Sequence, residues 1–492
     1  MKKRLLALTV AMIMAASTLV ACGGETTPDA KNANTDGAAT DDGAATDDGA
    51  TGDGDAAAEP VEEDFTATEV TAKLECPDTS AWTDADKIYF YSWNDEFGSR
   101  MQYVLDAYPE LQDYVEYVNL GVSGTDGTYQ TAIDTLIENK DEKFPSIIAA
   151  DNDVAKYYTE SDMTLPLSEI GITDEMYANA YNFSKQYATY NGELKALTWQ
   201  ACPGCFVYRT DIAEEVLGSS DPADVQEYVK DWDTFMDTAA KMKEAGYAMV
   251  AGPDEIKYAC FDQQTQPWIT VADDGTETLS LDSSVTDFFE LSKELFDNEY
   301  TNNASMWDAA WNAGYEGDVF GYFGCTWSVY WCMAFDDTLG EDSSKGKWHI
   351  CEGPVGYHWG GTYCMVMDGC PNTELAAFLV YSLCCDEDIM YTLAKDTGDF
   401  VNNKATIEAL IANDEGGLPA REILGGQDPF VIWAESVKNI NLSNACYLDA
   451  PLKDIITKAA QAYNAGEVAD VDAALQYVKD EVAKTYDYVV IE

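Results

Sequence analysis

Apolar and polar positions alternate along the first half of the chain in a regular way. Short apolar runs at 87–93 ("KIYFYSW"), 114–122 and 145–151 ("PSIIAAD") are typical of buried strands. Segments with helical spacing, at 96–111 and 129–139, separate them. Strands that alternate with helices predict a mostly parallel sheet covered on both faces. In such sheets ligands bind in the loops that follow the carboxyl ends of the strands.

The pattern changes beyond residue 210. Longer amphipathic segments at 233–246 and 283–300 predict helices, and Gly246 suits the end of the first one. Apolar runs at 318–331 and 361–370 predict further strands, and the last hundred residues are helical in pattern. The fold class is therefore α/β, and the more than about 400 residues of the body are enough for two domains with their own cores.

The first residues form an export signal. Lys2, Lys3 and Arg4 precede an apolar run from Leu5 to Val20, which is too short for an ordinary spanning helix. We interpret residues 1–21 as a signal peptide. The sequence "LVAC" before two glycines resembles the lipobox of bacterial lipoproteins, which implies cleavage before Cys22 and a diacylglycerol on its sulfur. The alternative is a secreted protein with a free Cys22 thiol.

A spacer follows the signal. Its composition is dominated by Gly, Ala, Thr, Asp and Glu, and "GAATDD" occurs twice in tandem. Such a segment has almost nothing apolar to bury, so we assign residues 22–80 to the lipidated cysteine and a disordered acidic tether. The aspartates also suggest calcium binding, but they lack the aliphatic spacing of a calcium-binding solenoid.

Charge and composition exclude several functions. The formal net charge of −61 repels nucleic acid and anionic lipid headgroups. The chain has 13 cysteines but only two histidines, which disfavours zinc and catalytic histidine. We expect no metal and no cofactor, and we interpret most cysteines as buried free thiols. No G-x-x-x-x-G-K-[ST] motif occurs, so ATP is hydrolysed elsewhere if at all.

The motif Cys202-Pro203-Gly204-Cys205 has several interpretations. Redox thiols usually lie at the start of a helix, whereas here the strand-like "FVYR" follows. A local disulfide fits a compartment outside the cell. Zinc would need a second ligand pair, which the sequence lacks.

The order of motifs resembles the maltose-binding-protein family of ABC-transporter solute receptors. The segments that carry the resemblance are "NGELKALTWQACPGCFVYRTDIAEEVLG", "FPSIIAADNDVAKYYTESDMTLPL", "HWGGTYCMVM" with "TELAAFLVYSL", and "LGGQDPFVIWAESVKNI". The resemblance extends over nearly all of residues 87–492. The sequence departs from the family pattern at Thr198, where proline is usual, and in the C-x-x-C motif.

The resemblance implies a two-domain periplasmic-binding-protein-like (type II) fold with hinge crossovers and a ligand cleft between the lobes. The N-terminal lobe would comprise 84–200 and 360–405, and the C-terminal lobe 201–359 and 406–492. It implies a receptor without catalytic residues, a monomer held by its lipid on the outer face of the cytoplasmic membrane. Its partners would be a carbohydrate and the permease subunits of an importer, which recognise the closed form.

A sugar site needs flat aromatic surfaces for C–H faces and carboxylates or amides for hydroxyls. Residues of these types follow the predicted strands, border the crossovers or match the family's contacts. The candidate ligand-binding residues are Trp93, Asn94, Asp95, Asp151, Asn152, Trp199, Gln200, Cys202, Gln266, Trp268, Trp327, Trp359, Gly361, Gln427, Asp428 and Trp433.

Each of these candidates also has a structural interpretation. Any single tryptophan is about as suited to the core as to a ligand platform, and the acidic residues after the strands suit helix caps. The sequence is also compatible with two other functions. A surface glycoside hydrolase needs a pair of carboxyl groups, and a receptor of the same fold for a polyamine or a peptide would also use the negative charge.

Overall fold

The computed structural model describes residues 65–334 and 344–491. The signal peptide at 1–21, Cys22 and residues 22–64 of the predicted tether lie outside this part of the chain. Within it, none of the helices combines the length and the apolar character that a bilayer crossing requires.

The first sheet has the strand order β2-β1-β3-β13-β6. Its strands are β1 (Ile88–Ser92), β2 (Val115–Asn119), β3 (Pro145–Asp151), β6 (Leu197–Thr198) and β13 (Thr362–Val366). The pairings of β1 with β2 and β3 are parallel, as predicted. However, β13 runs antiparallel to both β3 and β6, because the chain returns to this sheet from the second one instead of through a covering helix.

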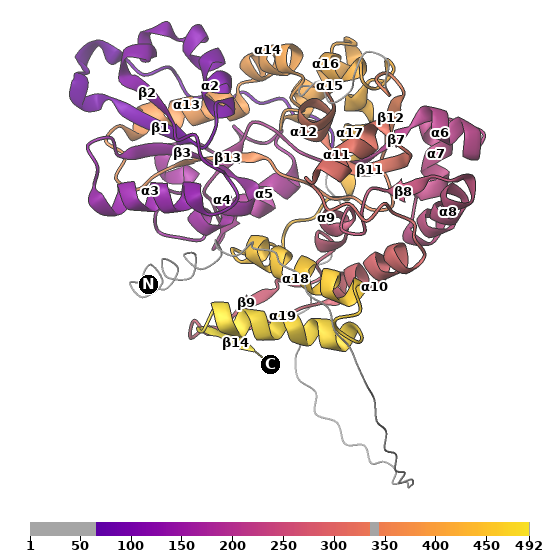
Figure 1. Cartoon of the computed structure of the whole chain (residues 1–492). Helices are drawn as coiled ribbons and strands as arrows, with labels where there is room; N and C mark the ends of the chain where they lie inside the picture. The colour runs from indigo at the N-terminus through magenta and orange to yellow at the C-terminus, as the bar shows by residue number, and fades with distance from the viewer. Residues whose placement is uncertain (1–64, 335–343, 492) are drawn as a thin grey trace, which may run out of the picture. The chain divides into compact units, whose positions relative to one another are not determined.

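Helices cover both faces of the first sheet. Figure 1 shows α2 (Glu96–Ala107) and α13 (Thr373–Cys385) on one face, and α3 (Thr128–Asn139) and α4 (Asn152–Thr159) on the other. Nearby lie α5 (Asn182–Ala188), α14 (Glu387–Thr397), α15 (Lys404–Ala412) and the short β4 (Thr189–Tyr190) and β5 (Glu193–Leu194). The central strand β3 is buried along almost its whole length, which explains its continuous apolar run.

The second sheet has the order β12-β7-β11-β8. It comprises β7 (Gly204–Arg209), β8 (Ala248–Val250), β11 (Val319–Cys325) and β12 (Trp348–Cys351). Only the β11–β8 pairing is parallel. The helices on this side are α6 (Thr210–Val216), α7 (Pro222–Val229), α8 (Trp232–Ala245), α9 (Lys257–Phe261), α10 (Ser283–Asp297), α11 (Ala309–Ala313), α12 (Thr326–Ser328), α16 (Leu418–Arg421) and α17 (Pro429–Ser436).

A third, smaller layer contains a sheet of its own. Strands β9 (Ile269–Val271), β10 (Glu277–Leu279) and β14 (Val489–Ile491) form a three-stranded sheet. The C-terminal helices α18 (Asp449–Asn464) and α19 (Val471–Thr485) pack on each other and on α10. The last part of the chain is therefore mostly helical, as its periodicity predicts.

Three segments run side by side between the two large sheets. Gln200 pairs with Val401, and Pro203 pairs with His358, as isolated antiparallel bridges. Backbone hydrogen bonds continue this pairing, with Ala201 N donating to Phe400 O and Trp359 N donating to Cys202 O. The Cys-Pro-Gly-Cys motif thus lies in the first of three connections that run side by side.

Residues 65–80, assigned to the tether from composition, belong to the folded body instead. The side chains of Phe65 and Leu74 pack against the core. Thr68 exchanges two hydrogen bonds with Asn179, at 2.8 Å and 2.9 Å. This stretch contains apolar residues, and these supply its packing against the core.

Candidate ligand cleft

A cavity of about 370 Å³ opens between the two large sheets. This volume lies within the range of small-molecule sites, roughly 300–1,000 Å³. Residues from the ends of both sheets surround it. Its lining consists of Trp93, Asn94, Glu96, Asp151, Gln200, Trp307, Asn312, Trp327, Trp331, Cys332, Gly361 and Thr362.

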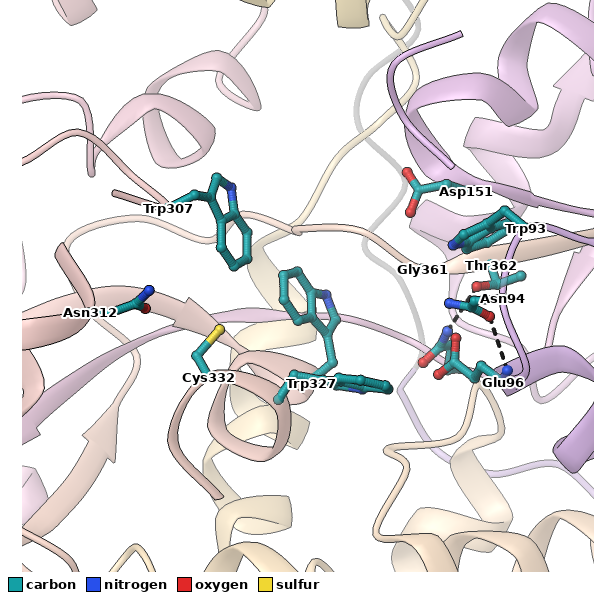
Figure 2. Close-up of a pocket in the computed structure, with 12 residues that line it drawn as sticks. Trp93, Asn94, Glu96, Asp151, Trp307, Asn312, Trp327, Cys332, Gly361 and Thr362 are labelled. Carbon is teal, nitrogen blue, oxygen red and sulfur yellow. Dashed lines mark hydrogen bonds between the residues drawn. The ribbon is translucent and has the colours of Figure 1, made fainter. Parts of the chain in front are cut away.

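The two walls of the cavity differ in chemistry. Figure 2 shows Trp93, Asn94, Glu96, Asp151 and Thr362 on one side, next to the first sheet. Trp93 and Asn94 follow β1, and Glu96 is the first residue of α2. Asp151 ends β3, and Thr362 begins the antiparallel strand β13. All of them therefore lie at the edge of the sheet where the carboxyl ends of β1 and β3 meet. Three of the four lining indoles, at Trp307, Trp327 and Trp331, come from the opposite side, from the loop before α11 and the turns after β11.

The polar side chains of the first wall are held by short-range hydrogen bonds. Asn94 Oδ1 accepts from Glu96 N at 3.0 Å, and Asp151 Oδ1 accepts from Asp153 N at 2.9 Å, which makes Asp151 the cap of α4. Gln200 Nε2 donates to Thr362 Oγ1 at 3.2 Å. Asp151 therefore caps α4 and also lines the cavity.

Two carboxyl groups that line the cavity, Glu96 and Asp151, have pKa values shifted upward. Burial raises the pKa of Glu96 to about 7, and the nearby charge of Asp399 adds to the rise. Burial also raises the pKa of Asp151 well above its ordinary range, and Asp153 adds to this effect. A carboxyl that is protonated near neutrality both donates and accepts, which suits a hydroxyl-bearing ligand.

The indoles of the second wall pack on one another. Trp327 stacks on Trp307 with ring centroids 6.1 Å apart and an interplanar angle of 8°. Its Nε1 donates to Trp359 O at 2.9 Å, which fixes the ring. Trp307 and Trp331 remain 54% and 52% exposed, so large apolar faces are open to the cavity. Exposed indoles that are rigidly placed are typical of binding surfaces.

Trp307 has an unusual backbone. Its φ of 75° lies in the left-handed region, which bulky residues rarely adopt. Such a conformation costs on the order of 1–3 kcal/mol and clusters at ligand-binding sites. The strain places the indole over the cavity.

A smaller cavity of about 160 Å³ adjoins the first and shares Glu96, Gln200, Trp327 and Trp331 with it. Arg100 and Asp399 also line it. Arg100 donates from Nε and Nη2 to the two oxygens of Asp399, each at 2.8 Å. The two cavities therefore form one site that includes a charged pair.

Six of the sixteen candidates from the sequence line the larger cavity. They are Trp93, Asn94, Asp151, Gln200, Trp327 and Gly361. Trp359 and Cys202 lie just behind the lining: Trp359 packs against Trp327 with centroids 4.7 Å apart, and the Cys202 sulfur lies beside Gly361. Asn152 is buried, and its Oδ1 lies 3.0 Å from Nε2 of His358.

The other candidates lie elsewhere. Trp199, Trp268 and Trp433 are fully buried, each with its Nε1 hydrogen-bonded, to Asp399, Asp282 and Cys205 respectively. The side chains of the remaining four candidates make contacts outside the cavity. Asp95 accepts from Asn119, Gln266 donates to Ser280 O, Gln427 pairs with the backbone of Ile350, and Asp428 caps α17 and pairs with Arg421.

The sequence gives weaker signals for the remaining lining residues. Glu96 and Trp331 are adjacent to candidates and share their segments. Trp307 and Asn312 lie in "SMWDAAWNAG", a stretch with no strand before it and no family motif, so only its two tryptophans mark it. Cys332 and Thr362 resemble core residues by type.

The Cys-Pro-Gly-Cys motif holds two free, buried thiols. Burial raises the pKa of Cys205 to about 12 and that of Cys202 further, so both stay protonated. Reactive thiols have the opposite shift. In the described residues every cysteine is a free thiol, and no cluster of three or more metal-ligating side chains occurs there.

Comparison with known proteins identifies the family. Residues 104–416 match the family model described as bacterial extracellular solute-binding protein. The chain belongs to this family. The match confirms the resemblance that the sequence motifs carry. No curated protein matches the sequence.

Solved structures show the same fold at low sequence identity. An extracellular solute-binding protein of family 1 aligns with a TM-score of 0.69 and 17% identity over 81% of this chain and 99% of its own. The sugar-binding protein MalE from Xanthomonas citri has a TM-score of 0.63 and 15% identity, covering 81% and 97%. The galacto-N-biose-/lacto-N-biose I-binding protein from Bifidobacterium longum, solved with lacto-N-biose, has 0.62 and 13%, covering 82% and 97%. These likenesses confirm the two-domain fold.

Proposed function

We propose that this solute-binding protein binds a sugar or oligosaccharide in the cleft and delivers it to the permease of an ABC importer. The observation that carries the proposal is the lining itself, four indoles together with carboxyl, amide and hydroxyl groups. Indoles offer flat faces to the C–H surfaces of a pyranose, and the polar groups match its hydroxyls. Structural neighbours that are named as sugar-binding proteins support the same class of ligand.

The mechanism we infer is closure of two lobes about the three connections. The N-terminal lobe comprises 84–200 and 360–405, and the C-terminal lobe 201–359 and 406–492. A ligand that contacts both walls binds the closed form better and therefore shifts the population toward it. The permease would recognise that form.

The proposal includes the location of the protein. After residues 1–21 are removed, a diacylglycerol on Cys22 would hold the protein, as a monomer, on the outer face of the cytoplasmic membrane. The acidic residues beyond Cys22 would serve as a spacer.

Glycoside hydrolysis is the alternative activity that an assay has to exclude. A glycosidase keeps one carboxyl protonated and its partner ionised, so the pKa values of the two differ. Here burial raises the pKa of both Glu96 and Asp151. Release of reducing ends from oligosaccharides by the purified protein would contradict the receptor function.

A thermal-shift screen tests the ligand class. A ligand present at about 100 times its Kd adds about 2.7 kcal/mol to the free energy of unfolding. We expect at least one mono- or oligosaccharide to raise the Tm. If only polyamines or peptides do so, the sugar assignment is wrong, and the protein is a receptor for that other solute.

A further inference from the structure

The charged groups around the cleft are almost all of one sign. The two cavities are lined by the carboxyl groups of Glu96, Asp151 and Asp399. Among the described residues that line them, Arg100 is the one basic side chain. Any ligand that enters the cleft therefore meets a wall of acidic groups opposite three of the four lining indoles.

The charge of Arg100 is already matched. Its Nε and Nη2 each donate to Asp399 at 2.8 Å, as a two-pronged contact, while Glu96 Oε1 lies 4.0 Å away. Trp199 Nε1 donates to the same Asp399 carboxylate at 3.2 Å and fixes it in place. Two N–H groups of the guanidinium are therefore already bound to a carboxylate, and Nη1 also donates to Ser99 Oγ at 3.1 Å. Arg100 lies nearer to Asp399 than to Glu96 and therefore offsets the charge of Glu96 only in part.

We propose that the cleft selects saccharides by charge, accepting uncharged ones and excluding those that carry a carboxylate, with Glu96 and Asp151 as the specificity-determining residues. The inference rests on the proposed sugar-binding function and narrows its substrate class. Hydroxyls donate to carboxylates and accept from carboxylic acids, so a neutral sugar satisfies the wall in either protonation state. A uronate instead brings a like charge into a poorly screened site.

The exclusion depends on pH in a definite direction. The pKa of Glu96 is about 7, so its side chain becomes an anion as the pH rises through neutrality. A uronate is ionised throughout this range. The preference for the neutral sugar therefore grows between about pH 6 and about pH 8, whereas exclusion by shape alone would not change.

The test uses matched probes. These are cellobiose, maltose, lactose and β-1,6-galactobiose, each paired with the uronate made by oxidising its terminal hydroxymethyl group. Isothermal titration calorimetry measures the ratio of the Kd of the uronate to that of the neutral sugar. For each neutral probe that binds, we expect a ratio of at least about 10 at about pH 8, equivalent to about 1.4 kcal/mol, and a smaller ratio at about pH 6.

Variants separate charge from shape. The double variant Glu96→Gln/Asp151→Asn should bring the ratio close to unity, even where its affinity for both sugars falls. Asp237→Asn, which removes an exposed carboxylate on α8, should leave it unchanged. A wild-type ratio near or below unity overturns the proposal, and so does a high ratio that persists in the double variant. If no saccharide in a broader screen binds, the sugar function itself fails, and this inference fails with it.

Discussion

Replacing Glu96 by glutamine should stabilise the ligand-free protein at alkaline pH and have little effect at acidic pH. The side chain of Glu96 is only 14% exposed. Burial and the charge of Asp399 raise its pKa from 4.5 to about 7, so the folded state disfavours the anion. Glutamine has nearly the same shape and no charge to bury.

The magnitude follows from the pKa shift. Each unit of pKa difference between folded and unfolded states is worth about 1.4 kcal/mol, so the shift corresponds to roughly 3 kcal/mol. Because the folded-state pKa is the higher one, the contribution of Glu96 to stability is fully present below about pH 4.5. It is lost as the pH rises through about 7. The variant loses nothing over this range, so its advantage grows with pH.

Urea unfolding of both proteins at about pH 5 and about pH 8 measures this difference. We expect the free energies of unfolding to be similar at the lower pH, with the variant ahead by up to about 3 kcal/mol at the higher. Asp237→Asn, which removes an exposed charge from the same acidic protein, accounts for general repulsion. An equal difference at both pH values, or a variant less stable at about pH 8, would refute the reasoning.

Three further predictions concern individual contacts. Trp327→Ala should weaken sugar binding about 30-fold or more, as for a hot spot worth about 2 kcal/mol, and should abolish sugar-induced fluorescence quenching. Trp232 stacks on Phe323 away from the cleft, so Trp232→Phe should preserve both the affinity and the quenching. Gly204→Ala should lose about 1–3 kcal/mol of stability in urea unfolding, because the new Cβ would lie 2.2 Å from Cζ of Tyr357; unchanged stability would mean that the ring moves aside freely. Asn152→Ala should cost about 1–3 kcal/mol in the same assay, because it removes the side-chain partner of His358 Nε2; a smaller cost would show that this contact adds little.

The order of elements in the first lobe is predictable from the sequence because it is local. The apolar runs at 87–93 and 145–151 have no competing interpretation once helical segments flank them, and they form β1 and β3. Strand direction is less accessible. The antiparallel placement of β13 depends on where the chain returns from the second sheet, and periodicity carries no information about that.

Residues of the candidate site can be predicted from the sequence where they directly follow a strand. They cannot be predicted where the amino-acid type is the only indication. Asn94 and Asp151 line the cavity because β1 and β3 deliver them to the same edge. Trp268 and Trp433 are buried instead, since an indole fills a core as well as it stacks on a ligand. Trp307 depends on a left-handed backbone in a loop, a conformation that no local pattern announces.

The placement of the indoles and the carboxyl groups on opposite walls has a kinetic consequence. The exposed faces of Trp307 and Trp331 can be met by a ligand before any charged group loses its water. The contacts with Glu96 and Asp151, on the other wall, complete only when the walls approach. If the walls close as proposed, the contacts with the carboxyl groups form last, and substitutions at Glu96 and Asp151 would change mainly the residence time of the bound ligand.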